Sequence, residues 1–149
     1  MKRWLYTPNS KLQTYIRVSA IILCISSLFA CGKDSSSAIP DVPVDYRVSV
    51  QEFNIKNRNG IMIVNGYGVA GLILTNSSGY YQAFDRCSTV NPEKRCPVVP
   101  DDTGLQATDT CSGGKFSLYD GAPVKAPAKK NLKQYSVIVT GGSLIQVSN

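Results

Sequence analysis

Histidine is absent from this sequence of 149 residues. Histidine is the usual general base and the commonest metal ligand, and it alone titrates near neutrality without perturbation. Its absence excludes Ser-His-Asp and Cys-His catalysis, together with zinc sites that combine cysteine with histidine. These arrangements are thereby excluded, and we expect that the protein is not an enzyme.

The sequence also lacks an apolar run long enough to cross a bilayer near its N-terminus. Residues 18–30 (VSAIILCISSLFA) form an apolar run of 13 residues, which is too short for a transmembrane helix. The preceding 17 residues contain no acidic residue and four basic ones, Lys2, Arg3, Lys11 and Arg17. A basic segment followed by a short apolar run is typical of a secretory signal peptide, predicted here over residues 1–30.

The apolar run ends at residues 28–32 (LFACG), which resemble the bacterial lipobox. In that motif a cysteine after a small residue is diacylated and becomes the new N-terminus, so the resemblance implies a lipid on Cys31 that attaches the chain to a membrane. Lys33 and Asp34 resemble the surface-export signals of Bacteroidetes lipoproteins. We expect a bacterial cell-envelope lipoprotein on the outer membrane, facing the periplasm or the cell surface. An ordinary cleaved signal or an uncleaved anchor is the alternative.

Excess charge is small once the signal segment is set aside. Removing its four basic residues from the 16 Lys and Arg leaves 12, against 10 Asp and Glu, which is a net charge of +2. We therefore expect no nucleic-acid partner, and a protein partner that the sequence does not identify. Four lysines surround Pro127, namely Lys125, Lys129, Lys130 and Lys133. They favour a solvated connection between strands, with contact to anionic lipid headgroups as the alternative.

Beyond the signal, residues 31–45 are rich in Ser, Pro and Asp and predict a flexible tether. Residues 46–149 contain repeated alternating or β-branched runs, and no stretch of ten or more residues has helical spacing. The run 46–51 alternates, and the turn 76–79 separates runs 71–75 and 80–85. Gly141 and Gly142 separate the last two runs. The predicted fold is a small all-β domain over residues 46–149.

Residues 84–135 resemble a Rieske domain. The resemblance is carried by residues 84–87 (FDRC), by residues 115–121 (KFSLYDG), and by Ala126-Pro127-Ala128 with Leu132 and Tyr135 downstream. It implies a small Rieske-like antiparallel β-sandwich or barrel.

The resemblance also identifies the positions of the cluster ligands. A Rieske [2Fe–2S] centre uses two cysteines and two histidines, in the boxes Cys-x-His and Cys-Pro-x-His-Gly-Ser-x-Phe. The first box corresponds to Cys87 and Thr89, and the second to Asp109 and Ser112. Cys87 is thus the only surviving ligand position, and hydroxyls are poor iron ligands. We expect no cofactor and no metal, with an electron-transfer [2Fe–2S] protein of altered ligation as the alternative.

Many Rieske domains join their two ligand loops by a further pair of cysteines. This resemblance implies a Cys96–Cys111 disulfide, with Cys87–Cys111 as the alternative. Closing a loop of 15 residues stabilises a protein by about 3 kcal/mol. The leading hypothesis is a lipid-anchored binding or structural module that has lost its cluster. A thiol–disulfide redox protein is the third hypothesis, although the chain lacks Cys-x-x-Cys and an activating histidine.

Overall fold

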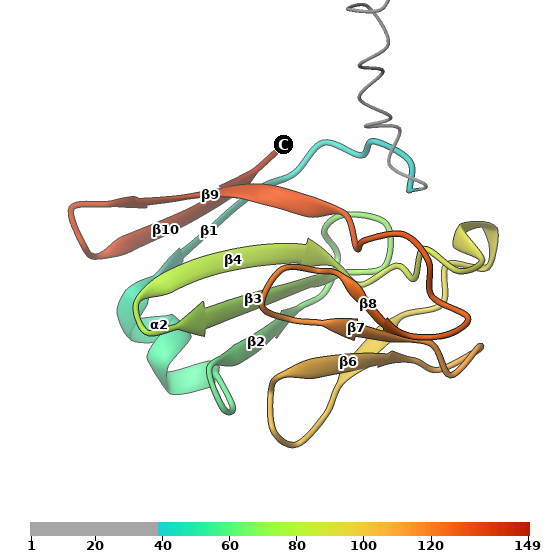
Figure 1. The fold of residues 1–149 in the computed structure, drawn as a ribbon. Helices are drawn as coiled ribbons and strands as arrows, with labels where there is room; N and C mark the ends of the chain where they lie inside the picture. Colours follow the sequence, from blue (N-terminus) through green and yellow to red (C-terminus); the bar gives the residue numbers. More distant parts are fainter. Residues whose placement is uncertain (1–38) are drawn as a thin grey trace, which may run out of the picture. The chain divides into compact units, whose positions relative to one another are not determined.

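The computed structural model describes residues 39–149 (Figure 1). The predicted signal peptide (residues 1–30), Cys31 and residues 32–38 of the predicted tether lie outside the described residues. Within residues 39–149, no helix has the length and apolar character needed to cross a membrane.

The described chain is built mainly of antiparallel strands in two sheets. The larger sheet has the order β1-β10-β9-β4-β3-β2 and the smaller one β5-β6-β7-β8. The elements are β1 (Asp45–Ser49), α2 (Val50–Lys56), β2 (Ile61–Val64), β3 (Leu72–Ser77), β4 (Tyr80–Asp85), η2 (Pro92–Lys94), β5 (Val98–Pro100), β6 (Gln106–Asp109), β7 (Lys115–Ser117), β8 (Pro123–Lys125), β9 (Gln134–Thr140) and β10 (Leu144–Ser148). The predicted all-β class is confirmed, apart from the short helix α2.

Helix α2 corrects the predicted strand over residues 46–51. The strand ends at Ser49, whose Oγ accepts a hydrogen bond of 3.0 Å from the backbone N–H of Glu52 and so caps the helix. Phe53 is 1% exposed and fixes the helix to the core. A seven-residue helix is too short to produce a recognisable helical period. Because polar and apolar residues go on alternating past Ser49, the predicted strand included the first two residues of the helix.

Both predicted turns connect antiparallel strands, although β3 extends to Ser77 and the first turn is therefore shorter than the predicted residues 76–79. Ser77 pairs with Tyr80, and the two residues between them, Ser78 and Gly79, have φ of 52° and 91°. Positive φ at both positions defines a type I′ turn, whose twist matches that of the strands. Residues 141–143 connect β9 to β10. The short strands β5 and β8 were not predicted, because each contains a proline, which argues against a strand.

Two buried clusters form the core. The first packs inside the larger sheet and contains Val44, Val48, Phe53, Met62, Val64, Leu72, Leu74, Ala83, Tyr135, Ile145 and Val147. The second contains Ile61, Ile73, Phe84, Val98, Ala107, Phe116, Leu118, Ala128 and Leu132. The second cluster joins the sheets, because Phe84 lies on β4 of the larger sheet and Phe116 on β7 of the smaller one. Residues 39–149 accordingly form one compact unit with its own core.

Packing begins before Tyr46, where the predicted tether was expected to end. Ile39 and Val44 are 2% and 6% exposed. The backbone N–H of Val44 donates to Oδ1 of Asn149 at 2.8 Å, and Nζ of Lys133 donates to Oδ1 of Asp41 at 2.7 Å. Residues 39–45 therefore belong to the folded unit, because their apolar side chains find a core despite the surrounding proline and aspartate.

Candidate functional site

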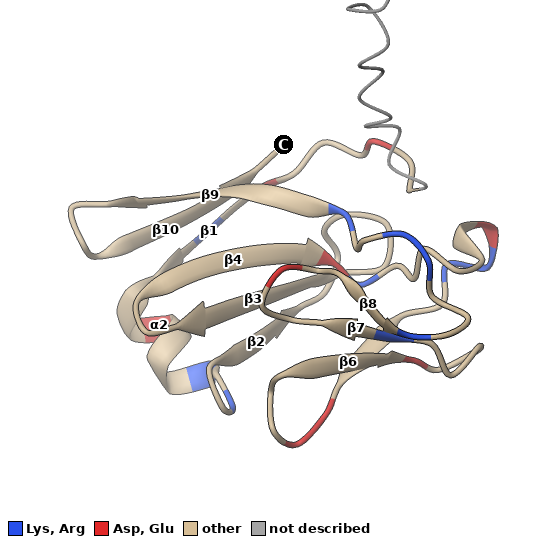
Figure 2. Ribbon diagram, viewed as in Figure 1, with Lys and Arg blue, Asp and Glu red and all other residues tan. Residues whose placement is uncertain are grey.

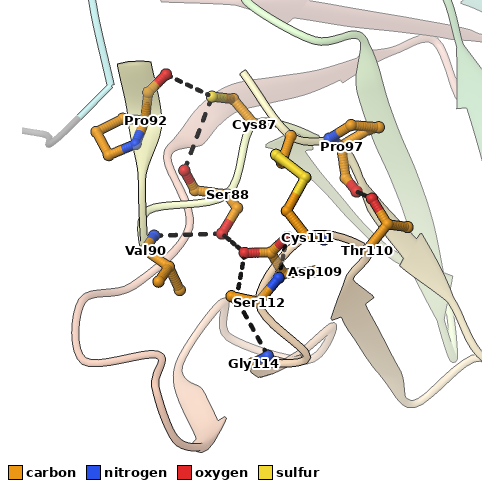
Figure 3. The surroundings of a disulfide bond; sticks show 11 residues. Cys87, Ser88, Val90, Pro92, Pro97, Asp109, Thr110, Cys111, Ser112 and Gly114 are labelled. Atoms are coloured by element: carbon orange, nitrogen blue, oxygen red, sulfur yellow. Dashed lines mark hydrogen bonds between the residues drawn. A yellow bond between two sulfur atoms is a disulfide. The ribbon is translucent and has the colours of Figure 1, made fainter. Parts of the chain in front are cut away.

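Two loops meet beside the smaller sheet. The first loop, residues 86–97, connects β4 to β5, and the second loop, residues 110–114, connects β6 to β7. A disulfide between Cys96 and Cys111 joins them, with the two Cα atoms 6.1 Å apart (Figure 3). The predicted pairing is confirmed, and the alternative Cys87–Cys111 pairing is wrong. Cys87 is the free cysteine of the described residues.

Asp109, which the sequence resemblance aligns with the second ligand cysteine, makes another connection between the loops. Its Oδ2 accepts hydrogen bonds from the hydroxyls of Ser88, in the first loop, at 2.6 Å and of Ser112, in the second loop, at 2.5 Å (Figure 3). Its Oδ1 accepts from the backbone N–H groups of Cys111 at 2.8 Å and Ser112 at 3.3 Å. The carboxylate thus caps its own turn and reaches across to the neighbouring loop.

These hydrogen bonds determine the charge of Asp109. The side chain is 1% exposed, and burial alone raises its pKa. The hydrogen bonds from Ser112 and Ser88 and from the two backbone N–H groups stabilise the charged form, and the resulting pKa lies below the ordinary value. Asp109 is therefore an ionised carboxylate at neutral pH, and four hydrogen bonds stabilise its negative charge.

Cys87 is buried at the start of the first loop. Its backbone N–H donates to Oδ1 of Asp85 at 2.7 Å, and its Sγ lies 3.8 Å from the carbonyl oxygen of Ser88 and 3.7 Å from that of Pro92. Burial, followed by the negative charge of Asp85, raises the pKa of the Cys87 thiol to about 11. The group is a protonated thiol at neutral pH, which is a poor nucleophile.

The hydroxyl groups of Thr89 and Ser112, which the sequence resemblance aligns with the two ligand histidines, also form hydrogen bonds. Thr89 donates from Oγ1 to the carbonyl oxygen of Lys130 at 2.7 Å, which ties the first loop to a third loop, residues 126–133, between β8 and β9. Ser112 donates to Asp109 and accepts from the N–H of Gly114 at 3.2 Å. The structure thus brings Asp109 and Ser112 together and directs Thr89 to the third loop.

This donor set does not fit a Rieske cluster, which requires two thiolates and two imidazoles. Cys87 is the one free thiol among residues 39–149, because Cys96 and Cys111 are bonded to each other. The ligand atoms of Cys96, Cys111 and Asp109 lie within 4.8 Å of one another, but a disulfide sulfur is not a thiolate ligand. Within residues 39–149, every buried side-chain nitrogen and oxygen has a hydrogen-bond partner.

Sequence reasoning missed the roles of Ser88 and Asp85. Ser88, which is fully buried, supplies the hydrogen bond that crosses between the loops. Asp85, also fully buried, accepts from the backbone N–H groups of Val69 at 2.7 Å, Ala70 at 3.2 Å and Cys87 at 2.7 Å. An aspartate as the last residue of a strand that ends in buried residues was the available signal for Asp85, whereas a serine in a loop gives none.

Comparison with known proteins shows which fold this is. No protein-family model matches the chain, and no curated protein gives a significant match. The plasma membrane Rieske protein PetC3 from the cyanobacterium Synechocystis PCC 6803 aligns over 73% of this chain and 99% of its own, with 20% identity and a TM-score of 0.50. The ferredoxin of carbazole 1,9a-dioxygenase from Nocardioides aromaticivorans IC177 aligns over 72% and 97%, with 18% identity and a TM-score of 0.49. The chain has a Rieske-like β fold, as the resemblance implied.

Proposed function

We propose that this Rieske-like domain is a lipid-anchored, extracytoplasmic binding or structural module that has lost its iron–sulfur cluster. The observation that carries the proposal is the state of Asp109. A carboxylate stands where the second ligand cysteine is expected, and its oxygens accept hydrogen bonds from Ser88 and Ser112 across the two loops. The loops are thereby held without a metal.

The disulfide and the Asp109 hydrogen bonds together hold the first and second loops in place, as the ligands of a bound cluster would. Iron–sulfur ligation ties together the loops that carry its ligands. Here Cys96–Cys111 supplies a covalent link and Ser88–Asp109 a charge-assisted one. With these two links between the first and second loops, a domain without a cluster keeps both loops ordered, and ordered loops are suited to binding a partner.

Two other functions are less well supported. An electron-transfer [2Fe–2S] protein with altered ligation would need more thiolates than Cys87 alone can supply, because Cys96 and Cys111 are joined in a disulfide. A thiol–disulfide redox protein would need a low-pKa thiol, whereas burial raises the pKa of Cys87 to about 11. We also propose that the protein is not an enzyme, with an accessory electron-transfer component as the alternative if a cluster is retained.

The test of the lost cluster is a visible absorption spectrum with an iron and acid-labile sulfide assay. The full-length gene is expressed in an iron-replete host, and its product is purified anaerobically from membranes beside a cluster-containing Rieske protein made in the same host. We expect a colourless protein with background iron, while the companion protein is coloured. Stoichiometric iron and sulfide with charge-transfer bands would overturn the proposal in favour of electron transfer.

The lipid anchor requires its own measurement. The proposal places the mature N-terminus at Cys31 and the protein in the bacterial envelope, on the outer membrane, with an unidentified protein partner. Intact mass of the membrane-extracted protein should show a chain beginning at Cys31 with an added diacylglyceryl group. The Cys31→Ser variant should lack the lipid mass. A mature chain that begins beyond Cys31, or one without lipid, would contradict the anchor.

A further inference from the structure

Basic residues gather around the loops at one end of the smaller sheet. We call this surface the basic loop end; its six members are Lys94 and Arg95 of the first loop, Lys115 and Lys125, which pair across β7 and β8, and Lys129 and Lys130 of the third loop. Five of the six side chains are exposed and Lys115 is half-buried. Figure 2 shows the blue segments in the loops on this side of β6, β7 and β8.

These cations have little compensating charge nearby. The three ion pairs among residues 39–149 use Arg47, Lys56 and Lys133, and none uses a member of the basic loop end. Glu93 is the one acidic residue in the three loops, and it is exposed. Asp109, at the end of β6 beside them, is buried. The other acids of the smaller sheet, Asp101, Asp102 and Asp120, lie in the turns at the opposite ends of the strands (Figure 2). Charge is thus separated along this sheet, with its positive end at the loops.

The three loops form one tied surface. The disulfide joins the first loop to the second, and the hydroxyl of Thr89 joins the first to the carbonyl of Lys130 in the third. The second loop packs against the third so closely that a Cβ placed on Gly114 would lie 3.1 Å from the backbone nitrogen of Ala128. Lysines on tied loops lose less backbone freedom when they bind than lysines on a free tail.

The chain enters the described unit beside this surface. Nζ of Lys133, at the end of the third loop, donates to the carbonyl oxygen of Pro40 at 3.1 Å and to Asp41 at 2.7 Å. Cys31 precedes Ile39 by eight residues, which span at most about 28 Å when fully extended. A lipid on Cys31 would therefore keep the third loop within about that distance of the membrane.

We propose that the basic loop end contacts anionic lipid headgroups and holds the domain with its disulfide-bonded loops facing the bilayer. This inference rests on the proposed lipid anchor for its location, but the contact itself needs only the folded unit. Anionic headgroups are favoured over an acidic protein because the chain that leads to Cys31 enters at Lys133, three residues after Lys130 of the basic loop end. Each cation near an anionic surface contributes about 1 kcal/mol, or about a fivefold increase in partitioning.

The test is co-sedimentation of residues 37–149, which contain both core clusters and lack Cys31, with phospholipid vesicles. One set of vesicles is pure phosphatidylcholine, and in the other about a third of the lipid is phosphatidylglycerol. We expect binding to the anionic vesicles alone, and its loss in about 1 M salt, where the Debye length is about 3 Å. The variant Lys129→Ala with Lys130→Ala should partition about 25-fold less, at about fivefold for each cation.

A control with the same change in net charge separates the patch from overall charge. Arg47 and Arg58 are exposed outside the three loops, and the variant Arg47→Ala with Arg58→Ala should stay within about twofold of the unaltered unit. Equal binding to both kinds of vesicle, no binding, or an equal loss in the control would overturn the inference and favour an acidic protein as the occupant. None of these outcomes bears on the lipid anchor, which the mass of the membrane-extracted protein tests separately.

Discussion

The hydroxyl of Tyr135 donates a hydrogen bond of 2.8 Å to Oδ2 of Asp85, across 50 positions of sequence. The bond lies where β9 meets β4, which pair only through Ala83–Tyr135 and Phe84–Gln134. The same carboxylate accepts the backbone N–H of Cys87, the second residue of the first loop. Asp85 therefore couples the junction of the two halves of the larger sheet to the start of the candidate site.

Replacing Tyr135 by phenylalanine should destabilise the domain by about 1–3 kcal/mol, because the buried Asp85 carboxylate loses a donor that water cannot replace. Burial, followed by the hydrogen bond and charge of Asp85, raises the pKa of Tyr135, so the hydroxyl remains a donor throughout the neutral range. Urea unfolding of the two proteins measures the loss. Tyr119→Phe is the matched control, since that side chain is 73% exposed and should change stability little. Equal midpoints for Tyr135→Phe and the unaltered protein would contradict the assigned role.

Acid should weaken the domain through Asp109. Its pKa is lowered in the folded state from an ordinary value of 3.8, so the stability it contributes is fully present above that value. This contribution is lost as the pH falls through the ordinary value and then through the lower folded one. Asp109→Asn should therefore cost about 1–3 kcal/mol at neutral pH and flatten the stability curve below about pH 4. Asp102→Asn, at an exposed turn position, is the control. Parallel acid profiles for the Asp109→Asn variant and the unaltered protein would show that another carboxylate dominates.

Cys87 should resist alkylation in the native protein. With a pKa raised to about 11 and a buried sulfur, its thiolate fraction at pH 8 is about two orders of magnitude below that of an ordinary cysteine. Peptide mapping after iodoacetamide treatment, with and without denaturant, reports Cys87 apart from the cysteines outside residues 39–149. We expect label at Cys87 only after unfolding. Rapid native labelling would instead favour the thiol–disulfide redox function.

Local signals made part of this structure predictable. The turn residues 76–79 lie between two β-branched or aromatic runs, so the sequence indicated a hairpin there, but not its register, which pairs Ser77 with Tyr80. The resemblance placed Asp109 and Ser112 at ligand positions and paired Cys96 with Cys111 by sequence order alone. The hydrogen bond from Ser88 to Asp109 links residues 21 positions apart through a folded loop, and no local pattern indicates it. Phe53 likewise gave no helical signal, because α2 is stabilised by its cap and by burial rather than by a long amphipathic period.

The disulfide and Asp109 should support each other in holding the first loop. Replacing Cys96 and Cys111 by alanine should cost about 3 kcal/mol through the 15-residue loop that the disulfide closes, while the Ser88–Asp109 hydrogen bond keeps the loops together. Adding Asp109→Asn removes the second link, and residues that share one network are expected to be non-additive. Trypsin provides a local readout, since Lys94 and Arg95 are exposed cleavage sites within the loop. Cleavage there should be slow in either parent variant and fast in the combination. If the cysteine double variant alone is cut as fast as the combination, the Asp109 hydrogen bonds do not hold the loops, and the disulfide alone has taken over the mechanical role of a cluster.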